Sequence, residues 1–201
     1  MNFDFSDNEK AFFTQIQEAM APLAEGRDLE SNDLDTIRGN LSAVLEVLGA
    51  TGYLQVALSE KDAPVSGTLA LMAAMEPMAG VSYSSFLSVE MSARMFGRAL
   101  TLGNSDTAAD IISDLTAGKI VGALALSEAA MNVENEPLTT EGIEDGDAFV
   151  LNGSKSFVIN GPVANWFAVV GRVDEHAAIF LVDKEASGLT LTARQATMGY
   201  D

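Results

Sequence analysis

The feature that most constrains the fold is a change in the hydrophobic pattern near Gly118. Before that glycine, apolar residues recur every three or four positions, the spacing that places them on one face of a helix. From Ile120 onward they come in short continuous or alternating runs, which are typical of strands. Helices followed by strands favour an α+β fold with the two kinds of element in separate layers. We therefore predict an all-helical domain over residues 1–118 and a mostly antiparallel β domain over residues 119–201.

The predicted helices have recognisable start and stop residues. The first opens with the capping box Ser6-Asp7-Asn8-Glu9 and should end at about Ala21, just before Pro22. The last is capped within Asn104–Asp106 and ends at Gly118, which suits the left-handed conformation of a helix C-terminus. The remaining three are expected over about residues 32–48, 66–75 and 82–102, with stops at Gly49, Pro77 and Gly103.

A buried strand and a tight hairpin are predicted at the start of the β domain. Ile120–Leu126 is an apolar run without a polar face, which is typical of a strand covered on both sides. Asn152-Gly153 suits the positive φ angles of a two-residue turn. This dipeptide is therefore expected to join Phe149–Leu151 to Phe157–Ile159 as a hairpin.

Two further β features follow along the chain. Trp166–Val173 and Ala177–Val182 should pair across a turn at Asp174–His176, which makes His176 an exposed turn residue. Leu189–Thr192 alternates apolar and polar residues and is predicted to be another strand.

The composition excludes several kinds of site. The chain has no cysteine and a single histidine, which rules out disulfides and thiolate metal ligands and leaves no pair of histidines for a zinc site. No apolar run approaches about 18 residues and the N-terminus is acidic, so we expect no membrane span, no secretion signal and a cytoplasmic location.

The charge balance bears on partners. With 11 basic and 29 acidic residues the formal net charge is -18, which disfavours binding to nucleic acid or anionic lipid. The acidic residues are spread along the chain, so solubility explains them better than cation storage does. An anionic ligand would have to be held by local backbone N–H groups and a few basic side chains.

The familiar nucleotide and metal motifs are missing from the sequence: there is no G-x-G-x-x-G, no P-loop and no H-E-x-x-H. The informative segment is Gly122–Asn132, where a buried strand opens into a loop of small residues. Such a loop lets backbone N–H groups approach a flat or anionic ligand closely. An ordinary exit from a strand into a loop is the competing interpretation.

Several segments, taken in order, carry a family resemblance. They are Phe3–Ser6, Leu48–Tyr53, Lys119–Glu128, Asp145–Gly161, Ala164–Trp166, Phe180–Lys184 and Met198–Gly199. The chain resembles the acyl-CoA dehydrogenase family: the first two segments are similar to its helical N-terminal domain and the others to its β-stranded middle domain. From this resemblance we expect the C-terminal helical domain of that family to be absent from this chain.

The resemblance implies a FAD site, in which the isoalloxazine ring lies against the β domain and an acyl-CoA thioester lies beside the other face of the ring. Ser127 falls where the family usually has a threonine that bonds the polar edge of the flavin, and it keeps the hydroxyl. Phe157 falls where a Trp or Phe packs on the ring. The implied cofactor-binding residues are Leu124, Ala125, Leu126, Ser127, Phe157, Val158 and Ile159, and the implied substrate-binding residue is Val133.

Two positions depart from the family pattern. Ile159 stands where a threonine commonly bonds near flavin N5, and an isoleucine has no side-chain donor. Ala129–Glu134 replaces the usual Pro-x-Ala-Gly-Ser-Asp run, which removes the glycine and the serine hydroxyl. Losing a hydrogen bond to a charged group costs on the order of 1.5 to 3 kcal/mol, so affinity for the cofactor is expected to fall about tenfold or more per site.

The carboxylate base of the family lies in its C-terminal domain, so no catalytic residue is named in this chain. The β domain is expected to be unfinished at Asp201, since an incomplete sheet leaves an unpaired edge. Either the chain is a fragment or another chain supplies the missing elements.

Two main hypotheses follow from the resemblance. The first is a FAD-dependent acyl-CoA dehydrogenase of fatty acid metabolism, with an electron-transfer flavoprotein as the expected electron acceptor and a homo- or hetero-oligomeric assembly. The second is a non-catalytic homologue that serves as partner subunit of an active one. A flavin oxidase or monooxygenase is a third possibility within the superfamily.

Overall fold

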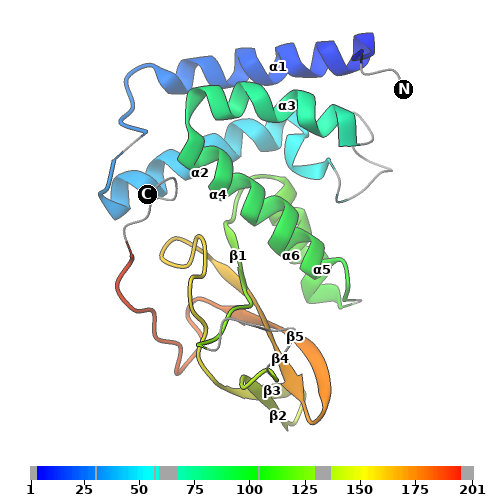
Figure 1. Ribbon diagram of the computed structural model, residues 1–201, viewed down its shortest axis with the longest axis vertical. Coiled ribbons are helices and arrows are strands. Elements are labelled where there is room, and N and C mark those ends of the chain that lie inside the picture. Colours follow the sequence, from blue (N-terminus) through cyan, green and yellow to red (C-terminus); the bar gives the residue numbers. More distant parts are fainter. Residues whose placement is uncertain are drawn as a thin grey trace.

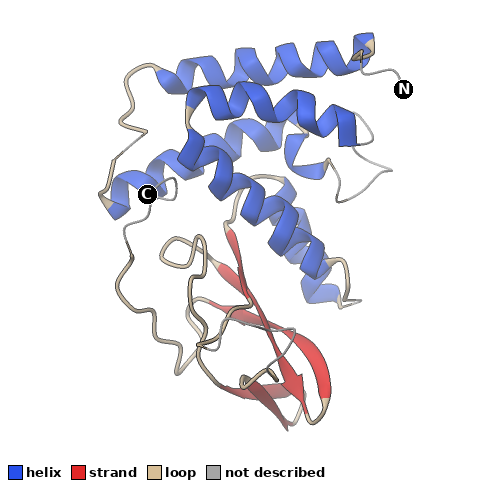
Figure 2. Cartoon of the chain, in the orientation of Figure 1, coloured by secondary structure: helices blue, strands red, loops and turns tan. Residues whose placement is uncertain are grey.

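The structure is a computed structural model that describes residues 4–29, 31–56, 58, 68–103, 105–129 and 137–195, with the backbone alone for residues 68–70. Helices form one layer and a single sheet forms the other (Figure 1). The two kinds of element are segregated in space as well as along the chain, as Figure 2 shows. The predicted α+β fold is therefore confirmed.

The helical layer contains all the helices expected from the hydrophobic pattern. In chain order they are α1 (Asp7–Ala24), α2 (Leu34–Thr51), the 3-10 turn η1 (Tyr53–Gln55), α3 (Thr68–Val81), α4 (Tyr83–Glu90), the π-helical turn η2 (Met91–Phe96), α5 (Gly97–Leu100) and α6 (Asp106–Thr116). Together α4, η2 and α5 account for the single long helix predicted over residues 82–102. No helix in the described ranges combines the length and apolarity needed to cross a membrane.

The predicted stops at the two prolines were wrong. Helix α1 continues through Pro22 to Ala24, and α3 continues through Pro77 to Val81. A proline inside a helix removes one backbone hydrogen bond, but the residue after each proline is buried, Leu23 at 9% exposure and Met78 at 1%. Burying such a side chain contributes about 1.5–3 kcal/mol, which offsets the loss.

Helix α2 ends at Gly52 and not at Gly49 as predicted. Gly52 takes the left-handed conformation (φ 78°) and its N–H bonds the carbonyls of Gly49 and Leu48. Gly49 stays helical and serves packing, since a Cβ there would lie 2.6 Å from the carbonyl oxygen of Ala117. The predicted stop at Gly118, in contrast, is confirmed by its φ of 74°.

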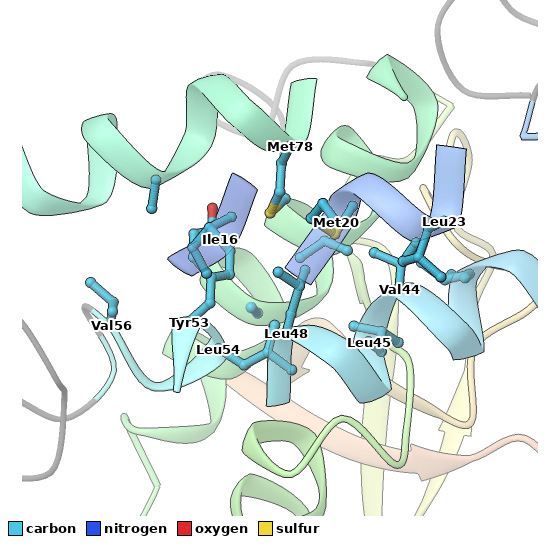
Figure 3. Packing of buried hydrophobic residues seen from close by; sticks show 14 of the residues in the cluster. Ile16, Met20, Leu23, Val44, Leu45, Leu48, Tyr53, Leu54, Val56 and Met78 are labelled. Atoms are coloured by element: carbon cyan, nitrogen blue, oxygen red, sulfur yellow. The ribbon is translucent and has the colours of Figure 1, made fainter. Parts of the chain in front are cut away.

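One hydrophobic core lies between α1, α2, α3 and η1 (Figure 3). The larger side chains that are fully buried in it are those of Ile16, Met20, Val44, Leu45, Leu48, Tyr53, Leu54, Val56 and Met78. A second, smaller cluster joins Phe96, Leu100, Ile111 and Leu115 to Ala168 of the sheet, so the two layers share apolar contacts. The division of the chain into domains at residue 118 stays a prediction.

The sheet contains β1 (Gly122–Ala125), β2 (Glu141–Asp145), β3 (Ala148–Asn152), β4 (Trp166–Val173) and β5 (His176–Asp183). Strand β4 is central: β1 and β2 pair with it in parallel, and β5 pairs with it in antiparallel orientation. Strands β2 and β3 form an antiparallel hairpin beside them. The sheet is thus mixed, and the antiparallel ladders hold most of its paired residues.

The hairpin predicted at Asn152-Gly153 was wrong. Strand β3 pairs with β2 across Gly146 (φ 62°), and Phe157–Ile159 lies outside every strand. Gly153 serves a close approach, because a Cβ on it would lie 2.5 Å from Thr140 Oγ1. The chain therefore leaves β3 toward Thr140 and β1 and does not fold back on β3.

The other β predictions had mixed outcomes. The β4–β5 hairpin is confirmed, and His176 is exposed, although it is the first residue of β5 and pairs with Val173. The strand predicted at Ile120–Leu126 is confirmed in its central part only. The strand predicted at Leu189–Thr192 was wrong: the segment is exposed and extended outside the sheet, and the N–H of Leu189 donates to the carbonyl of Ala186 in a local turn.

Candidate cofactor-binding cleft

An open cleft of about 1790 Å³ runs along the sheet. Its lining comes from β3, the turns at residues 153–163, strands β4 and β5, and the extended segment 186–195, together with residues of the helical layer such as Ile37, Ser88 and Leu100. Ligand pockets for drug-sized molecules are typically about 300–1,000 Å³. The cleft therefore has room for a large flat ligand with an extended tail.

Phe157 is the most unusual residue in this cleft. Its side chain is 64% exposed, and its backbone takes a left-handed conformation with φ of 55°. A bulky residue with positive φ is strained and is tolerated only where the surroundings hold it in place. Phe157 lines the cleft, so a planar ring system bound there can stack on its aromatic side chain.

The turn that carries Phe157 is fixed at both ends. The N–H of Ser156 donates to the carbonyl of Ser127 (2.9 Å), which ties the turn to the segment after β1. At the other end the side-chain amide of Asn160 donates to the carbonyl of Ser88 in α4 (2.8 Å). These two hydrogen bonds place Phe157 between the sheet and the helical layer.

Four of the residues named from the sequence come together in the cleft lining: Ala125, Phe157, Val158 and Ile159. Ile159 is half-buried and presents only hydrocarbon. The cleft lining does not include Leu124, Leu126 or Ser127, and the side chain of Leu124 packs against the cluster around Phe96. Val133 lies outside the described residues.

Beside the cleft lies a buried ion pair that sequence reasoning did not single out. Lys155 Nζ lies 2.7 Å from Glu128 Oε1, and both side chains are only 8% exposed. Burial favours a neutral carboxyl, but hydrogen bonds from Lys155, Thr139 and Thr140 prevail and hold the pKa of Glu128 well below its ordinary value. A lysine within the apolar Phe149–Ile159 stretch was the available signal, since lysine is almost never buried without a partner.

A second buried polar cluster lies within the helical layer. Tyr53 Oη donates to Glu90 Oε1 (2.5 Å), and the guanidinium of Arg94 donates to the carbonyls of Tyr53 (3.1 Å) and Leu54 (3.3 Å). Burial raises the pKa of Glu90. Burial also raises the pKa of Tyr53, and the nearby carboxylate of Glu90 raises it further.

In the described ranges, no group of three or more acidic or histidine side chains is arranged to bind a metal ion.

Comparisons with known proteins agree with this architecture. The family model described as "Acyl-CoA dehydrogenase, middle domain" matches residues 123–201. Benzylmalonyl-CoA dehydrogenase of Aromatoleum aromaticum is 28% identical over 99% of this chain and 53% of its own length. Mitochondrial isovaleryl-CoA dehydrogenase of Bos taurus is 30% identical over 79% of this chain and 37% of its own length.

A solved structure shows the same fold. The acyl-CoA dehydrogenase of Bacillus anthracis, complexed with FAD, superposes with a TM-score of 0.81 at 21% identity, covering 98% of this chain and 34% of that one. The chain thus spans about half, or less, of the length of the relatives that it matches.

Proposed function

The chain belongs to the acyl-CoA dehydrogenase family, and from that membership we propose that it holds FAD against its sheet for the α,β-dehydrogenation of an acyl-CoA thioester. In this reaction a base removes the α-proton of the thioester and the β-hydrogen leaves as hydride, for which bound FAD supplies the acceptor atom, N5. No residue of the chain is assigned as the base, and we propose that residues outside this chain supply it.

The observation that carries the proposal is the strained, exposed Phe157 at the cleft. A single exposed phenylalanine is ordinary, but one that is 64% exposed and also held at a positive φ is strained without any gain from burial, and such strain is concentrated at ligand-binding sites. Offset stacking on a second ring system contributes about 0.5–1.5 kcal/mol beyond the area that it buries. Stacking on a tricyclic flavin ring would therefore stabilise the Phe157 side chain relative to its exposure to water.

The other residues of the cleft have supporting roles in the proposal. Ala125 and Val158 would supply a small and an apolar surface beside the ring, and the hydroxyl of Ser127, which follows β1 outside the cleft lining, is proposed to bond the polar edge of the ring. Leu124 and Leu126 precede Ser127 in the same segment, and we propose that they contribute through their backbone groups. Val133 would contact the acyl-CoA.

The donors around the cleft suit an uncharged polar ring. Ser154 and Ser156 line it, and the ammonium of Lys155 is already engaged by Glu128. Hydroxyl and backbone N–H donors match the carbonyl and ring nitrogens of a flavin. The hydroxyl and backbone N–H donors of this cleft thus fit the isoalloxazine ring, whereas a diphosphate would need a cation such as Arg194, which also lines the cleft.

A second function is favoured by one residue. Ile159 lines the cleft without a hydrogen-bond donor, so the cleft lacks a side-chain donor at this position. This favours a non-catalytic homologue that binds FAD weakly and serves as partner subunit of an active relative. The enzymatic proposal ranks first because the loss of one donor costs affinity and rate without removing the site.

We propose the electron acceptor, the assembly and the location from the family resemblance. The electron acceptor would be an electron-transfer flavoprotein, the assembly a homo- or hetero-oligomer, and the location cytoplasmic. An oxidase or monooxygenase would be recognised by fast reaction of the reduced flavin with oxygen.

An activity assay separates the two functions. The purified protein, saturated with FAD, is mixed with acyl-CoA thioesters of different chain length and an artificial electron-accepting dye, with Ile159→Thr measured in parallel. The enzymatic proposal predicts dye reduction that depends on the thioester and is faster in Ile159→Thr. Flavin-loaded protein that reduces no dye in either form would support the non-catalytic function instead.

A further inference from the structure

The buried Glu128–Lys155 pair connects the two chain segments that face the cofactor in the proposed function. Lys155 immediately precedes Ser156 and Phe157, while Glu128 immediately follows Ser127. We propose that Glu128 and Lys155 are positioning residues that fix Phe157 against the end of β1 and thereby set the affinity of the cleft for flavin. This proposal rests on the proposed function and deepens it.

The contacts of Lys155 bridge from the turn to the segment after β1. Its Nζ donates to Glu128 Oε1 (2.7 Å) and to the main-chain carbonyl of Leu126 (3.0 Å). One residue further along each segment, the N–H of Ser156 donates to the carbonyl of Ser127 (2.9 Å). The two residues just before Phe157 are thus bonded to three consecutive residues of the segment after β1, Leu126, Ser127 and Glu128.

The contacts of Glu128 fix the carboxylate from the opposite side. Its Oε2 accepts from the backbone N–H of Thr139 (2.7 Å) and from the Thr139 hydroxyl, and its Oε1 accepts from the N–H of Thr140 (2.9 Å). Thr140 directly precedes β2. The segment that leads into β2 therefore holds the carboxylate of Glu128 in place. The carboxylate in turn holds the ammonium of Lys155 in one position.

Stability alone does not explain why charged residues occupy this place. A buried ion pair is often no more stabilising than apolar residues of the same volume, because removing two charges from water costs several kcal/mol per ion. What the charged pair adds is direction, since each hydrogen bond has a preferred geometry. Here that direction fixes a main-chain carbonyl and an adjacent strained turn, which an apolar pair would leave free to shift.

The first arm of the test needs no cofactor. Amide hydrogen exchange is measured for Lys155→Met, for the conservative Lys155→Arg, and for Lys119→Met, which breaks the exposed Lys119–Asp114 pair as a matched control. We expect the Ser156 amide to exchange about tenfold faster or more in Lys155→Met, relative to amides of α2, and close to the parent rate in Lys155→Arg and Lys119→Met. An unchanged Ser156 amide in folded Lys155→Met would overturn the proposal.

The second arm is a double-mutant cycle on FAD affinity. If Lys155 acts through Phe157, Lys155→Met should weaken FAD binding by about tenfold in the parent and by less than about twofold in a Phe157→Ala background. Equal losses in both backgrounds would assign Lys155 a merely structural role and overturn the proposal. Where Lys155→Met does not fold, Glu128→Gln takes its place in both arms.

The two arms separate the two claims. A parent protein that binds no FAD would contradict the proposed function, whereas the exchange rate of Ser156 would still decide whether the pair positions the turn. A parent that binds FAD, together with additive losses in the cycle, would retain the function and reject the positioning role.

Discussion

The side-chain amide of Asn160 donates a 2.8 Å hydrogen bond to the main-chain carbonyl of Ser88, a residue 72 positions earlier in the chain. Asn160 is buried and takes a left-handed backbone conformation (φ 65°), which asparagine tolerates better than most residues do. This one residue thus ends the turn that presents Phe157 and connects it to helix α4.

Replacing Asn160 should separate these two contributions. Asn160→Ala loses the hydrogen bond and strains the left-handed backbone, so we expect the free energy of unfolding to fall by about 2–3 kcal/mol. Asn160→Gly loses the hydrogen bond but accepts the backbone conformation, so it should cost about 1 kcal/mol less than Asn160→Ala. Urea denaturation measures both, and equal stability of the two variants would contradict the role of the backbone strain.

Two glycines with the same backbone conformation should respond differently to alanine. Gly118 (φ 74°) and Gly26 (φ 78°) are both left-handed, but a Cβ on Gly118 would lie 2.1 Å from the carbonyl oxygen of Leu45, whereas nothing lies within 4 Å of one on Gly26. Gly26→Ala should cost about 1 kcal/mol from backbone strain alone. Gly118→Ala should cost several times more, because helix α2 would have to move, and thermal unfolding curves that shift equally in the two variants would argue against this contact.

The hydroxyl of Tyr53 should matter for stability because its acceptor is buried. Tyr53→Phe leaves Glu90 Oε1 without its 2.5 Å hydrogen bond, and losing a partner of a buried charged group costs about 1.5–3 kcal/mol. Tyr83→Phe is the matched control, since Tyr83 is 56% exposed, and it should change the free energy of unfolding by less than about 0.5 kcal/mol. The pair is compared by chemical denaturation at neutral pH.

Glu128 should make the stability of the protein sensitive to acid. Its pKa in the folded protein lies below the ordinary value of 4.5, so its contribution to stability is complete above that pH and is lost as the pH falls below it. We expect the free energy of unfolding to fall with acid more steeply in the parent than in Glu128→Gln. The exposed Glu46→Gln should retain the steep fall of the parent, and identical pH profiles for the parent and Glu128→Gln would contradict the assignment.

Features that depend on neighbouring residues were predictable from the sequence. The capping box is present with both of its hydrogen bonds, Ser6 N–H to Glu9 Oε2 (2.6 Å) and Glu9 N–H to Ser6 Oγ (3.3 Å). The left-handed Gly118 and the β4–β5 hairpin followed in the same way from local turn and cap chemistry. In each case the residues that decide the structure lie within a few positions of one another.

Features that depend on distant contacts were not predictable. Asn152-Gly153 and Asp145-Gly146 are both good turn dipeptides, and the choice between them is made by Gly153 fitting against Thr140 and by Ser156 bonding Ser127. The helices pass Pro22 and Pro77 for the same kind of reason, because tertiary burial outweighs a lost backbone bond.

The candidate site divides in the same way. Phe157, Val158 and Ile159 were named from a family resemblance, and they lie together in the cleft. The Glu128–Lys155 pair joins residues 27 positions apart, and no local pattern connects them. The pair could be identified only from the three-dimensional structure.

The central claim, a flavin stacked on Phe157, is tested most directly by titrating the purified protein with FAD and recording visible absorbance and the fluorescence of the bound flavin. The account predicts saturable binding with a shifted flavin spectrum in the parent, and binding about tenfold or more weaker in Phe157→Ala, whereas Tyr83→Ala, at an exposed aromatic residue of α4 outside the cleft lining, should bind nearly as well as the parent. A parent protein that leaves the FAD spectrum unchanged, or a Phe157→Ala variant that binds as tightly as the parent, would contradict it.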